Sequence, residues 1–293
     1  MDRSALQESA PTTQADSAGS LPGLGEKEFQ FLARFVYQHS GIVLGPHKRQ
    51  LVQGRLGKRL RALRLADWRA YCEYLSTQPD DELDALVSAI STNVTAFFRE
   101  AHHFDFLSGK VLPESPTTSA QQLRIWSAGC STGEEPYSIA MILAEAMQSL
   151  PKGIDAKILA TDLSPQALAT AEGGLYRIDR LTGISEERRQ RWFQRGTGAL
   201  AGMARVHPRL CKLITFRRLN LLKSWPMRGQ FDAIFCRNVV IYFNKETKQD
   251  LFQRFAARLP DGGHLFLGHS ESMHGLNEDF DLIGRTIYRK KVS

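Results

Sequence analysis

With 293 residues and 42% apolar side chains, the chain is long enough for about two domains, at least one of them with a substantial core. It has no apolar run near the roughly 20 residues of a membrane span, and residues 1–20 contain no hydrophobic signal core, so we expect a cytoplasmic protein without membrane insertion. The formal net charge of +7 at pH 7 indicates an acidic partner: nucleic acid, a membrane surface or an anionic protein segment.

The part of the chain before residue 123 predicts a tail, a helical domain and a linker. Residues 1–22 are rich in Ser, Thr, Ala, Gln and Pro, which predicts a disordered tail. In residues 23–90 the apolar side chains recur at helical spacing, which predicts a small all-α N-terminal domain. Residues 91–122 end in the polar stretch SPTTSAQQ and predict a linker.

In residues 123–293 short apolar runs alternate with helical stretches. The predicted strands are LRIWSAG (123–129), AKILATD (156–162), KLITF (212–216), FDAIFC (231–236), GGHLFLG (262–268) and TIYRK (286–290). The helical stretches lie at 135–149, near 167–172 and at 245–259. This alternation predicts an α/β domain with a mostly parallel, doubly wound sheet. Ligands of such sheets bind at the carboxyl ends of the strands, so we expect the functional residues directly after strands.

One segment, from about 173 to 211, does not follow the alternation of strands and helices. It carries turn-forming glycines at 196, 198 and 202. We interpret it as a small inserted β-subdomain. The alternative is a long irregular loop, although loops of this length are uncommon unless they are functional.

The stretch RIWSAGCSTGEEPYS, residues 124–138, has the layout of a nucleotide-binding strand, turn and helix, with Ser131 and Thr132 as candidate helix N-caps. It lacks both the P-loop ending and the G-x-G-x-x-G pattern. Glu134 and Glu135 stand where a pyrophosphate would approach the helix, and they would repel it. A phosphate-free adenosine compound with a cationic sulfonium, S-adenosylmethionine, suits these carboxylates. Alternatively, the two glutamates only favour the positive end of the helix dipole.

Two later strands also end in polar residues. Asp162 ends the strand in ILATDLSPQAL and predicts an acceptor for ribose hydroxyls; it could instead cap a helix, although Ser164 is the better cap candidate. The stretch FDAIFCRNVVIYF places Arg237 and Asn238 at a strand end and Tyr242 shortly beyond. Amino-directed DNA methyltransferases typically carry a Pro-Pro-Tyr-like motif at this point, so the stretch argues against base methylation.

A row of basic residues lies in the helical domain. Between residues 48 and 64 the chain has many Lys and Arg and no acidic residue. On a helical projection Lys48, Arg55 and Arg59 line up beside an apolar stripe. Such a row can dock an acidic helix by charge complementarity, so we predict that these three residues bind the substrate. A contact to a nucleic-acid backbone or a merely solvated face are the alternatives.

The sequence predicts no metal site. The four cysteines are far apart and form no Cys-x-x-Cys pair, which favours buried reduced thiols. His102 and His103 are adjacent, and neighbouring residues on a helix point about 100° apart, so we expect them to be poor joint ligands.

Five motifs in order make the chain similar to the chemotaxis receptor glutamate methyltransferases, the CheR family. They are STNVTAFFRE (91–100), WSAGCSTGEEPYSIA (126–140), ATDLS (160–164), FDAIFCRNVVIYF (231–243) and LGHSES (267–272). The resemblance runs from about residue 24 to the C-terminus. It implies a helical domain before a Rossmann-like catalytic domain with a small β-subdomain. It also implies methyl transfer from S-adenosylmethionine to glutamates of chemoreceptor helical bundles, with S-adenosylhomocysteine as the other product.

The resemblance also implies roles for individual residues. Arg99 and Tyr242 would be catalytic and lie nearest the methyl group. The implied cofactor-binding residues are Asn93, Thr95, Arg99, Glu135, Asp162, Asn220, Leu221, Arg237 and Asn238. From composition alone, Arg99 would be a surface arginine at a helix end. The family resemblance further implies recruitment to membrane receptor arrays, and contact between the β-subdomain and a receptor C-terminal peptide, but no nucleic-acid partner.

The chemistry of the acceptor fits a site without a catalytic base, because a glutamate side chain with a pKa near ~4.3 is already ionised at neutral pH. Two other hypotheses remain: a nucleic-acid methyltransferase that uses the basic row, and a cofactor-binding regulatory protein without catalysis. We expect deletion of the segment Arg195 to Pro208 to weaken receptor methylation without abolishing cofactor binding.

Overall fold

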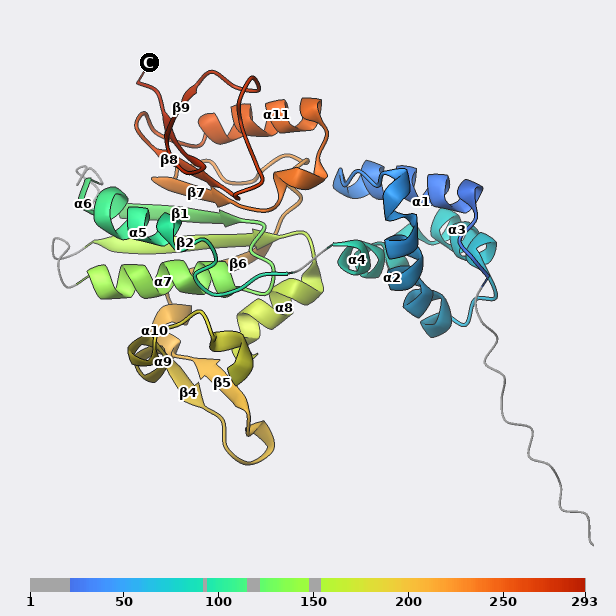
Figure 1. The fold of residues 1–293 in the computed structure, drawn as a ribbon, viewed down its shortest axis with the longest axis horizontal. Coiled ribbons are helices and arrows are strands. Elements are labelled where there is room, and N and C mark those ends of the chain that lie inside the picture. The colour runs from blue at the N-terminus through green and yellow to red at the C-terminus, as the bar shows by residue number, and fades with distance from the viewer. Residues whose placement is uncertain (1–21, 92–93, 115–121, 148–153, 293) are drawn as a thin grey trace, which may run out of the picture.

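A computed structural model describes residues 22–91, 94–114, 122–147 and 154–292 of the chain. The predicted tail, apart from Pro22, lies outside these described residues, as does most of the polar end of the predicted linker. Figure 1 shows the helices up to residue 90 as one body beside a central sheet, with a small second sheet on the far side of α7.

The N-terminal helices enclose a core of their own. They are α1 (Glu26–Ser40), η1 (Pro46–Lys48), α2 (Arg49–Ala62), α3 (Trp68–Thr77) and α4 (Pro79–Ile90). The apolar positions at helical spacing are the buried ones, among them Leu32, Val52 and Leu86, each with no exposed surface. The helical periodicity of the sequence therefore identified the buried face of this all-α domain correctly.

The central sheet has seven strands in the order β6-β2-β1-β7-β8-β10-β9. Their bounds are β1 Gln122–Ala128, β2 Asp155–Asp162, β6 Ile214–Arg218, β7 Ala233–Cys236, β8 His264–Leu267, β9 Phe280–Gly284 and β10 Ile287–Lys290. The strands from β6 to β8 pair in parallel, whereas β10 and β9 are antiparallel. The predicted fold class is confirmed; the sequence reading missed β9, whose burial pattern has no alternation.

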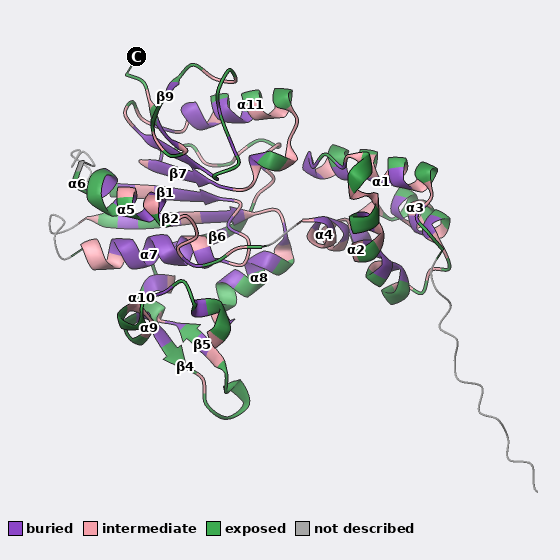
Figure 2. Ribbon diagram, viewed as in Figure 1, coloured by how far each residue is buried: buried purple, intermediate pink, exposed green. Residues whose placement is uncertain are grey.

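Both faces of the sheet are covered, as Figure 2 shows by the buried colour of its central strands. Along β1, Leu123 and Ile125 face one core, which includes α7 (Glu134–Ala146) and α5 (His102–Phe106). The alternate residues Trp126 and Ala128 face a second core with α11 (Lys245–Ala256). β1 is therefore buried on both faces, as is typical of a central parallel strand, although Arg124 and Ser127 interrupt its apolar residues. The remaining helices here are η2 (Leu107–Val111), α6 (Leu112–Glu114), α8 (Pro165–Gly173) and η5 (Val240–Tyr242).

The segment predicted as an insertion contains a three-stranded sheet in the order β3-β5-β4. Its elements are β3 Leu175–Arg177, η3 Ile178–Leu181, α9 Glu186–Trp192, β4 Phe193–Arg195, η4 Gly198–Leu200, β5 Met203–Val206 and α10 Pro208–Cys211. It is not an independent unit, because Phe193, Ala204 and Val206 are buried in the same core as α7. These shared contacts make the expected deletion of 195–208 a poor test, since it would open the core of the catalytic domain.

The helical domain contacts the loops at the carboxyl ends of the parallel strands (Figure 1). The backbone N–H of Val43 donates to the carbonyl of Tyr242 at 2.9 Å, and the Asn220 amide donates to the carbonyl of His39 at 2.8 Å. The hydroxyls of Ser88 and Ser164 lie 2.7 Å apart. The two domains therefore meet over the sheet edge where ligands of doubly wound folds bind.

Candidate active site

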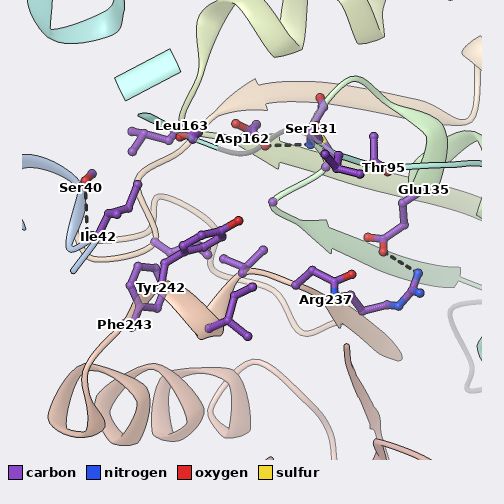
Figure 3. A pocket seen from close by; sticks show the side chains of 18 of the residues that line it. Ser40, Ile42, Thr95, Ser131, Glu135, Asp162, Leu163, Arg237, Tyr242 and Phe243 are labelled. Atoms are coloured by element: carbon purple, nitrogen blue, oxygen red, sulfur yellow. Dashed lines mark hydrogen bonds and ion pairs between the residues drawn. The ribbon is translucent and has the colours of Figure 1, made fainter. Parts of the chain in front are cut away.

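A pocket lies at this edge, between the helical domain and the ends of β1, β2, β6 and β7 (Figure 3). Ser40 and Ile42 come from the helical domain. The linker that joins the domains contributes Ser91, Val94, Thr95, Ala96 and Arg99. The other lining residues follow strands: Gly129, Cys130, Ser131, Glu135, Asp162, Leu163, Leu219, Asn220, Leu221, Arg237, Asn238, Val239, Ile241, Tyr242 and Phe243. The sequence analysis placed functional residues after strands, and it missed those from the helical domain.

The first loop of the pocket depends on two glycines. Gly129 has φ +91° and Gly133 has φ +98°, both in the left-handed region that favours glycine. A Cβ on Gly129 would lie 2.4 Å from Val239, and one on Gly133 would lie 2.8 Å from the Tyr176 hydroxyl. The candidate caps Ser131 and Thr132 were wrong, because Gly133 is the N-cap of α7 and no side chain caps this helix.

Asp162 ends β2 inside the pocket. Its two carboxylate oxygens accept hydrogen bonds from the backbone N–H groups of Ser131 at 2.7 Å and Ser164 at 2.9 Å. Burial raises the pKa of this carboxyl, and the backbone donors oppose the shift. Ser164 caps α8 by accepting from Ala167, so Asp162 is not the cap of that helix. Each Asp162 oxygen retains a lone pair for a ligand in the pocket.

A buried ion cluster lies where β1 and β7 end. The Arg237 guanidinium, whose side chain is 3% exposed, lies 3.0 Å from a Glu135 oxygen and 3.4 Å from a Glu100 oxygen. Glu135 also accepts a hydrogen bond from Ser127 at 2.7 Å. Burial raises the pKa of Glu135, against the attraction of Arg237. At Glu100 burial also raises the pKa, but Arg237 and His269 outweigh it and leave the pKa lowered.

The two adjacent glutamates of the opening loop have different surroundings. Glu135 lines the pocket, whereas Glu134 is buried and pairs with Arg180 of η3 at 3.0 Å. Arg180 also donates to the carbonyl of Thr95 at 2.9 Å. The inserted segment therefore holds both the first helix turn and the linker beside the pocket.

The linker provides Thr95 and Arg99 to the pocket, whereas Asn93 lies outside the described residues. The Arg99 guanidinium donates to the carbonyl of Val94 at 2.8 Å. Among the described residues no carboxylate lies within ion-pair distance of Arg99, in contrast to Arg237. A half-exposed guanidinium at a pocket wall can accept a carboxylate ligand.

The residues predicted after β6 and β7 also reach the pocket. The Asn220 side chain donates to His39 and accepts from the N–H of Leu222, so it fixes the contact between the domains. Leu221 and Asn238 line the wall, and Asn238 has a left-handed φ of +58°. Figure 3 shows the Tyr242 ring pointing into the space between Asp162 and Arg237.

The basic row of the helical domain has partners inside that domain. Arg59 makes a two-pronged ion pair with buried Glu82, at 2.7 and 2.9 Å. Arg55 donates to the carbonyl of Ile90 at 2.6 Å, at the end of α4. Only Lys48 lies near the pocket, with its ammonium 5.5 Å from the centre of the Tyr242 ring. The substrate role of Arg55 and Arg59 stays a prediction, and these contacts favour a structural role for both.

The angular argument against His102 and His103 as joint ligands was wrong in its geometry. Their ring centres lie 4.1 Å apart, and potential ligand atoms of Glu100, His102 and His103 lie within 4.8 Å of one another. Both rings contact the carbonyl of Arg285 through Nε2, and the Arg237 guanidinium lies 3.4 Å from Glu100. A bound cation would be repelled by that guanidinium.

Sequence reasoning missed Glu100 and Glu271, although both lie within the quoted motifs. Glu100 joins the ion cluster described above, and Glu271 accepts backbone hydrogen bonds from the loop after β7. A single carboxylate in a motif gives no indication of its partner, because these partners lie 137 and 33 positions away in the sequence.

The pocket fits an adenosine compound with a positive charge. The carboxylates of Asp162 and Glu135 provide acceptors, and Leu163, Leu219 and Leu221 provide apolar wall. The Ser131 hydroxyl is buried and has no hydrogen-bond partner among the described residues, so a ligand group could satisfy it. Apolar walls with few convergent polar groups are typical of cofactor sites.

The Rossmann-like sheet with this pocket at its carboxyl edge defines an S-adenosylmethionine-dependent methyltransferase. The model of the CheR methyltransferase SAM-binding domain matches residues 93–289, and the model of the CheR all-α domain matches residues 27–91. The chain therefore belongs to the CheR methyltransferase family, and the resemblance inferred from the five motifs is confirmed.

Relatives along nearly the whole chain agree with this family. The chemotaxis protein methyltransferase of Salmonella typhimurium is 44% identical, with 90% of each chain covered. That of Escherichia coli is 43% identical, with 90% of this chain and 91% of the relative covered. Chemotaxis protein methyltransferase 2 of Pseudomonas aeruginosa is 43% identical over 89% of this chain and 92% of its own.

Proposed function

We propose that the chain transfers the methyl group of S-adenosylmethionine to glutamate side chains of chemoreceptors, giving glutamate methyl esters for chemotactic adaptation. The observation that supports this most is the pocket itself. It combines cofactor-type carboxylates, Asp162 and Glu135, with a guanidinium and a phenol, Arg99 and Tyr242, and the described lining residues include no histidine or lysine. Membership of the CheR family supports the choice of acceptor.

A carboxylate acceptor needs no catalytic base. A glutamate side chain is ionised at neutral pH and attacks without losing a proton. When bound, S-adenosylmethionine supplies an electrophilic methyl group. The protein must then align the two reactants and exclude water from the pocket. The helical domain contributes to this exclusion because Ser40 and Ile42 cover one side of the pocket.

The pocket residues divide between holding the cofactor and holding the acceptor. Asp162 would accept from ribose hydroxyls, and Glu135, held by Arg237, would face the cationic end of the cofactor. Asn220, Leu221 and Asn238 would complete the wall. Thr95 would hold the cofactor from the linker side, and the same role is proposed for Asn93.

Arg99 and Tyr242 would act nearest the reacting atoms. The Arg99 guanidinium would orient a carboxylate, and the Tyr242 hydroxyl would donate to the acceptor oxygen or lie beside the methyl group. Lys48, near the Tyr242 ring, would attract an acidic receptor helix toward the pocket. The arginines at 55 and 59 would support α2, the helix that begins directly after this lysine.

Methyl transfer from labelled S-adenosylmethionine to purified receptor cytoplasmic fragments tests the proposal. We expect label that alkali releases as methanol, because carboxyl methyl esters are alkali-labile whereas base and amine methyl groups are not. Arg99→Ala should lose most of this label. Arg228→Ala, an exposed arginine on the loop before β7, is the matched control and should retain it. Alkali-stable label, or label only on nucleic acid, would overturn the proposed acceptor.

We further propose that the β-subdomain binds a C-terminal peptide of the receptor by strand addition and so recruits the cytoplasmic enzyme to receptor arrays. In the order β3-β5-β4, the strands β3 and β4 are edges that pair with β5 alone in this sheet, so the peptide would add beside one of them. Arginines outnumber acidic residues in this segment, which favours an acidic peptide.

Point variants test this tethering role better than the deletion of 195–208. Fluorescence anisotropy of a labelled receptor C-terminal peptide should show weaker binding to Arg195→Glu, on β4, while cofactor affinity stays unchanged. Arg177→Glu makes the same charge change on β3 and is the matched control. A loss confined to Arg177→Glu would move the peptide to the other edge, and no peptide binding by the wild type would overturn the tether.

No helix among the described residues has both the length and the apolar character needed to cross a membrane.

A further inference from the structure

We propose that Glu271 is a positioning residue of the methyl-transfer site: its carboxylate fixes the backbone of residues 238–241 and thereby the side chains of Asn238 and Tyr242. The inference rests on the proposed function of that site. Glu271 lies after β8, outside the pocket lining, and no part of the mechanism above uses it.

Glu271 joins two loops through hydrogen bonds to their backbone N–H groups, and we call these contacts a clamp. The residue is 5% exposed, and one carboxylate oxygen accepts from the backbone N–H groups of Asn238 at 2.8 Å and Gly268 at 2.6 Å. The other oxygen accepts from the N–H of Ile241 at 3.1 Å. One buried carboxylate thus satisfies backbone donors from two loops, which follow the neighbouring parallel strands β7 and β8. A carboxylate has the acceptor capacity for all three bonds, whereas an amide has only one oxygen.

The backbone that Glu271 holds includes a residue in an unfavourable conformation. Asn238 has a φ of +58°, in the left-handed region that costs non-glycine residues energy. The bond from its N–H to Glu271 holds this conformation at the point where β7 turns into η5. Asn238, Ile241 and Tyr242 all line the pocket, so a shift of this turn would move one complete wall.

Gly268 adds a second, steric part to the clamp. A Cβ at this position would lie 2.4 Å from the Asn238 side-chain nitrogen and 2.8 Å from the Asn238 backbone nitrogen. No real Cβ atom approaches so closely, so only glycine lets the loop after β8 pack against Asn238. In the sequence GHSE, Gly268 therefore allows the loop to pack closely against Asn238, and Glu271 provides the carboxylate.

The same loop also reaches the ion cluster of Arg237. His269 lies 3.0 Å from a Glu100 oxygen, and Glu100 pairs with Arg237. The loop after β8 thus contacts both the Arg237 cluster and the Asn238 turn, which makes it a support for the residues proposed to act in the pocket.

The substitution Glu271→Gln tests the role with little change of shape. The matched control is Asp232→Asn, which replaces a half-buried carboxylate that also accepts a backbone N–H, from Arg124 at 2.8 Å, but at the opposite end of β7. Each variant is compared with the wild type by thermal unfolding, by kcat and KM for methyl transfer to receptor fragments, and by calorimetric affinity for S-adenosylhomocysteine.

We expect both variants to unfold at a lower temperature, but only Glu271→Gln to lose kcat, by on the order of 100-fold, because misplacement of reacting groups by about 1 Å has that effect. We also expect its affinity for S-adenosylhomocysteine to fall about tenfold, which corresponds to one hydrogen bond. Gly268→Ala leaves the carboxylate intact, pushes Asn238 directly and should produce the same pattern.

A kcat and a cofactor affinity of Glu271→Gln within about twofold of the wild type, or equal losses in Asp232→Asn, would overturn the role. If the wild type transferred no methyl to any receptor fragment, the proposed function would fail by itself. The S-adenosylhomocysteine affinities of the three variants would then still decide whether Glu271 positions the pocket wall.

Discussion

Replacement of Arg237 by Gln should destabilise the protein far more than the loss of an ordinary surface charge. The Arg237 side chain is 3% exposed, and its two partners, Glu135 and Glu100, are 12% and 11% exposed. Removal of the guanidinium leaves two carboxylates in a site with little water. Breaking a buried ion pair from one side costs about 3–5 kcal/mol, so we expect a loss of that size in the free energy of unfolding at pH 7.5.

The dependence on pH follows from the same charges. Burial is the largest effect on the pKa of Glu100 and raises it, and Arg237 is the first of the groups that outweigh it. Without Arg237 the folded-state pKa of Glu100 should lie above its unfolded value. The protonated form is then favoured by folding, so the penalty is present at neutral pH and disappears as the pH falls through the raised pKa.

Urea unfolding of the wild type, Arg237→Gln, Glu135→Gln and the double variant at pH 7.5 and 5.5 checks both statements. The double variant should lose less stability than the sum of the single variants, because it leaves one carboxylate fewer unpaired. A loss below about 1 kcal/mol for Arg237→Gln, or losses that add within about 0.5 kcal/mol, would refute the reasoning.

Three other changes give separate tests. Asp162→Asn should weaken S-adenosylhomocysteine binding by on the order of 10- to 100-fold, since hydrogen bonds to charged groups contribute about 1.5–3 kcal/mol. Burial raises the pKa of Asp162, so when the pH is lowered, calorimetry of the wild type should show affinity being lost at a higher pH than for an ordinary Asp. Burial, with Arg237 and His102, lowers the pKa of His103 from 6.5 to about 3. Between these two pKa values the unfolded state binds a proton at His103 that the folded state does not, so the free energy of unfolding falls as the pH is lowered. His103→Gln should remove this dependence, which is up to about 1.4 kcal/mol per pH unit in urea unfolding measured between pH 6 and 4. Tyr71→Phe, which removes a buried donor to Glu82 at 3.0 Å, should cost about 1–3 kcal/mol with an unchanged m-value and unchanged methyl transfer.

Much of the fold could be predicted from local sequence. Every predicted strand of the catalytic domain is present, although its ends differ by a few residues, because an apolar run between polar turns suffices to define a buried parallel strand. Asp162 could be placed in the pocket for the same reason, since the end of β2 defines its position. The motif 231–243 likewise placed Arg237, Asn238 and Tyr242 after a strand.

The errors occurred where partners are far apart in the chain. Arg55 and Arg59 formed a basic row on a helical projection, but the projection contained no information about α4, which supplies Ile90 and Glu82 as their partners. The predicted side-chain cap of α7 failed because the tight packing of Gly133 against Tyr176 of the inserted segment determined that turn.

The sequence by itself determined the elements, the α/β class and the family, because these follow from the period of apolar residues and from motifs of contiguous residues. Only the tertiary structure decided which charges are neutralised and which face the pocket. Glu134 and Glu135 are adjacent, yet one pairs with Arg180 outside the pocket and the other with Arg237 at its wall. Successive side chains at the start of a helix point in different directions, so the groups that approach from other elements decide the role of each.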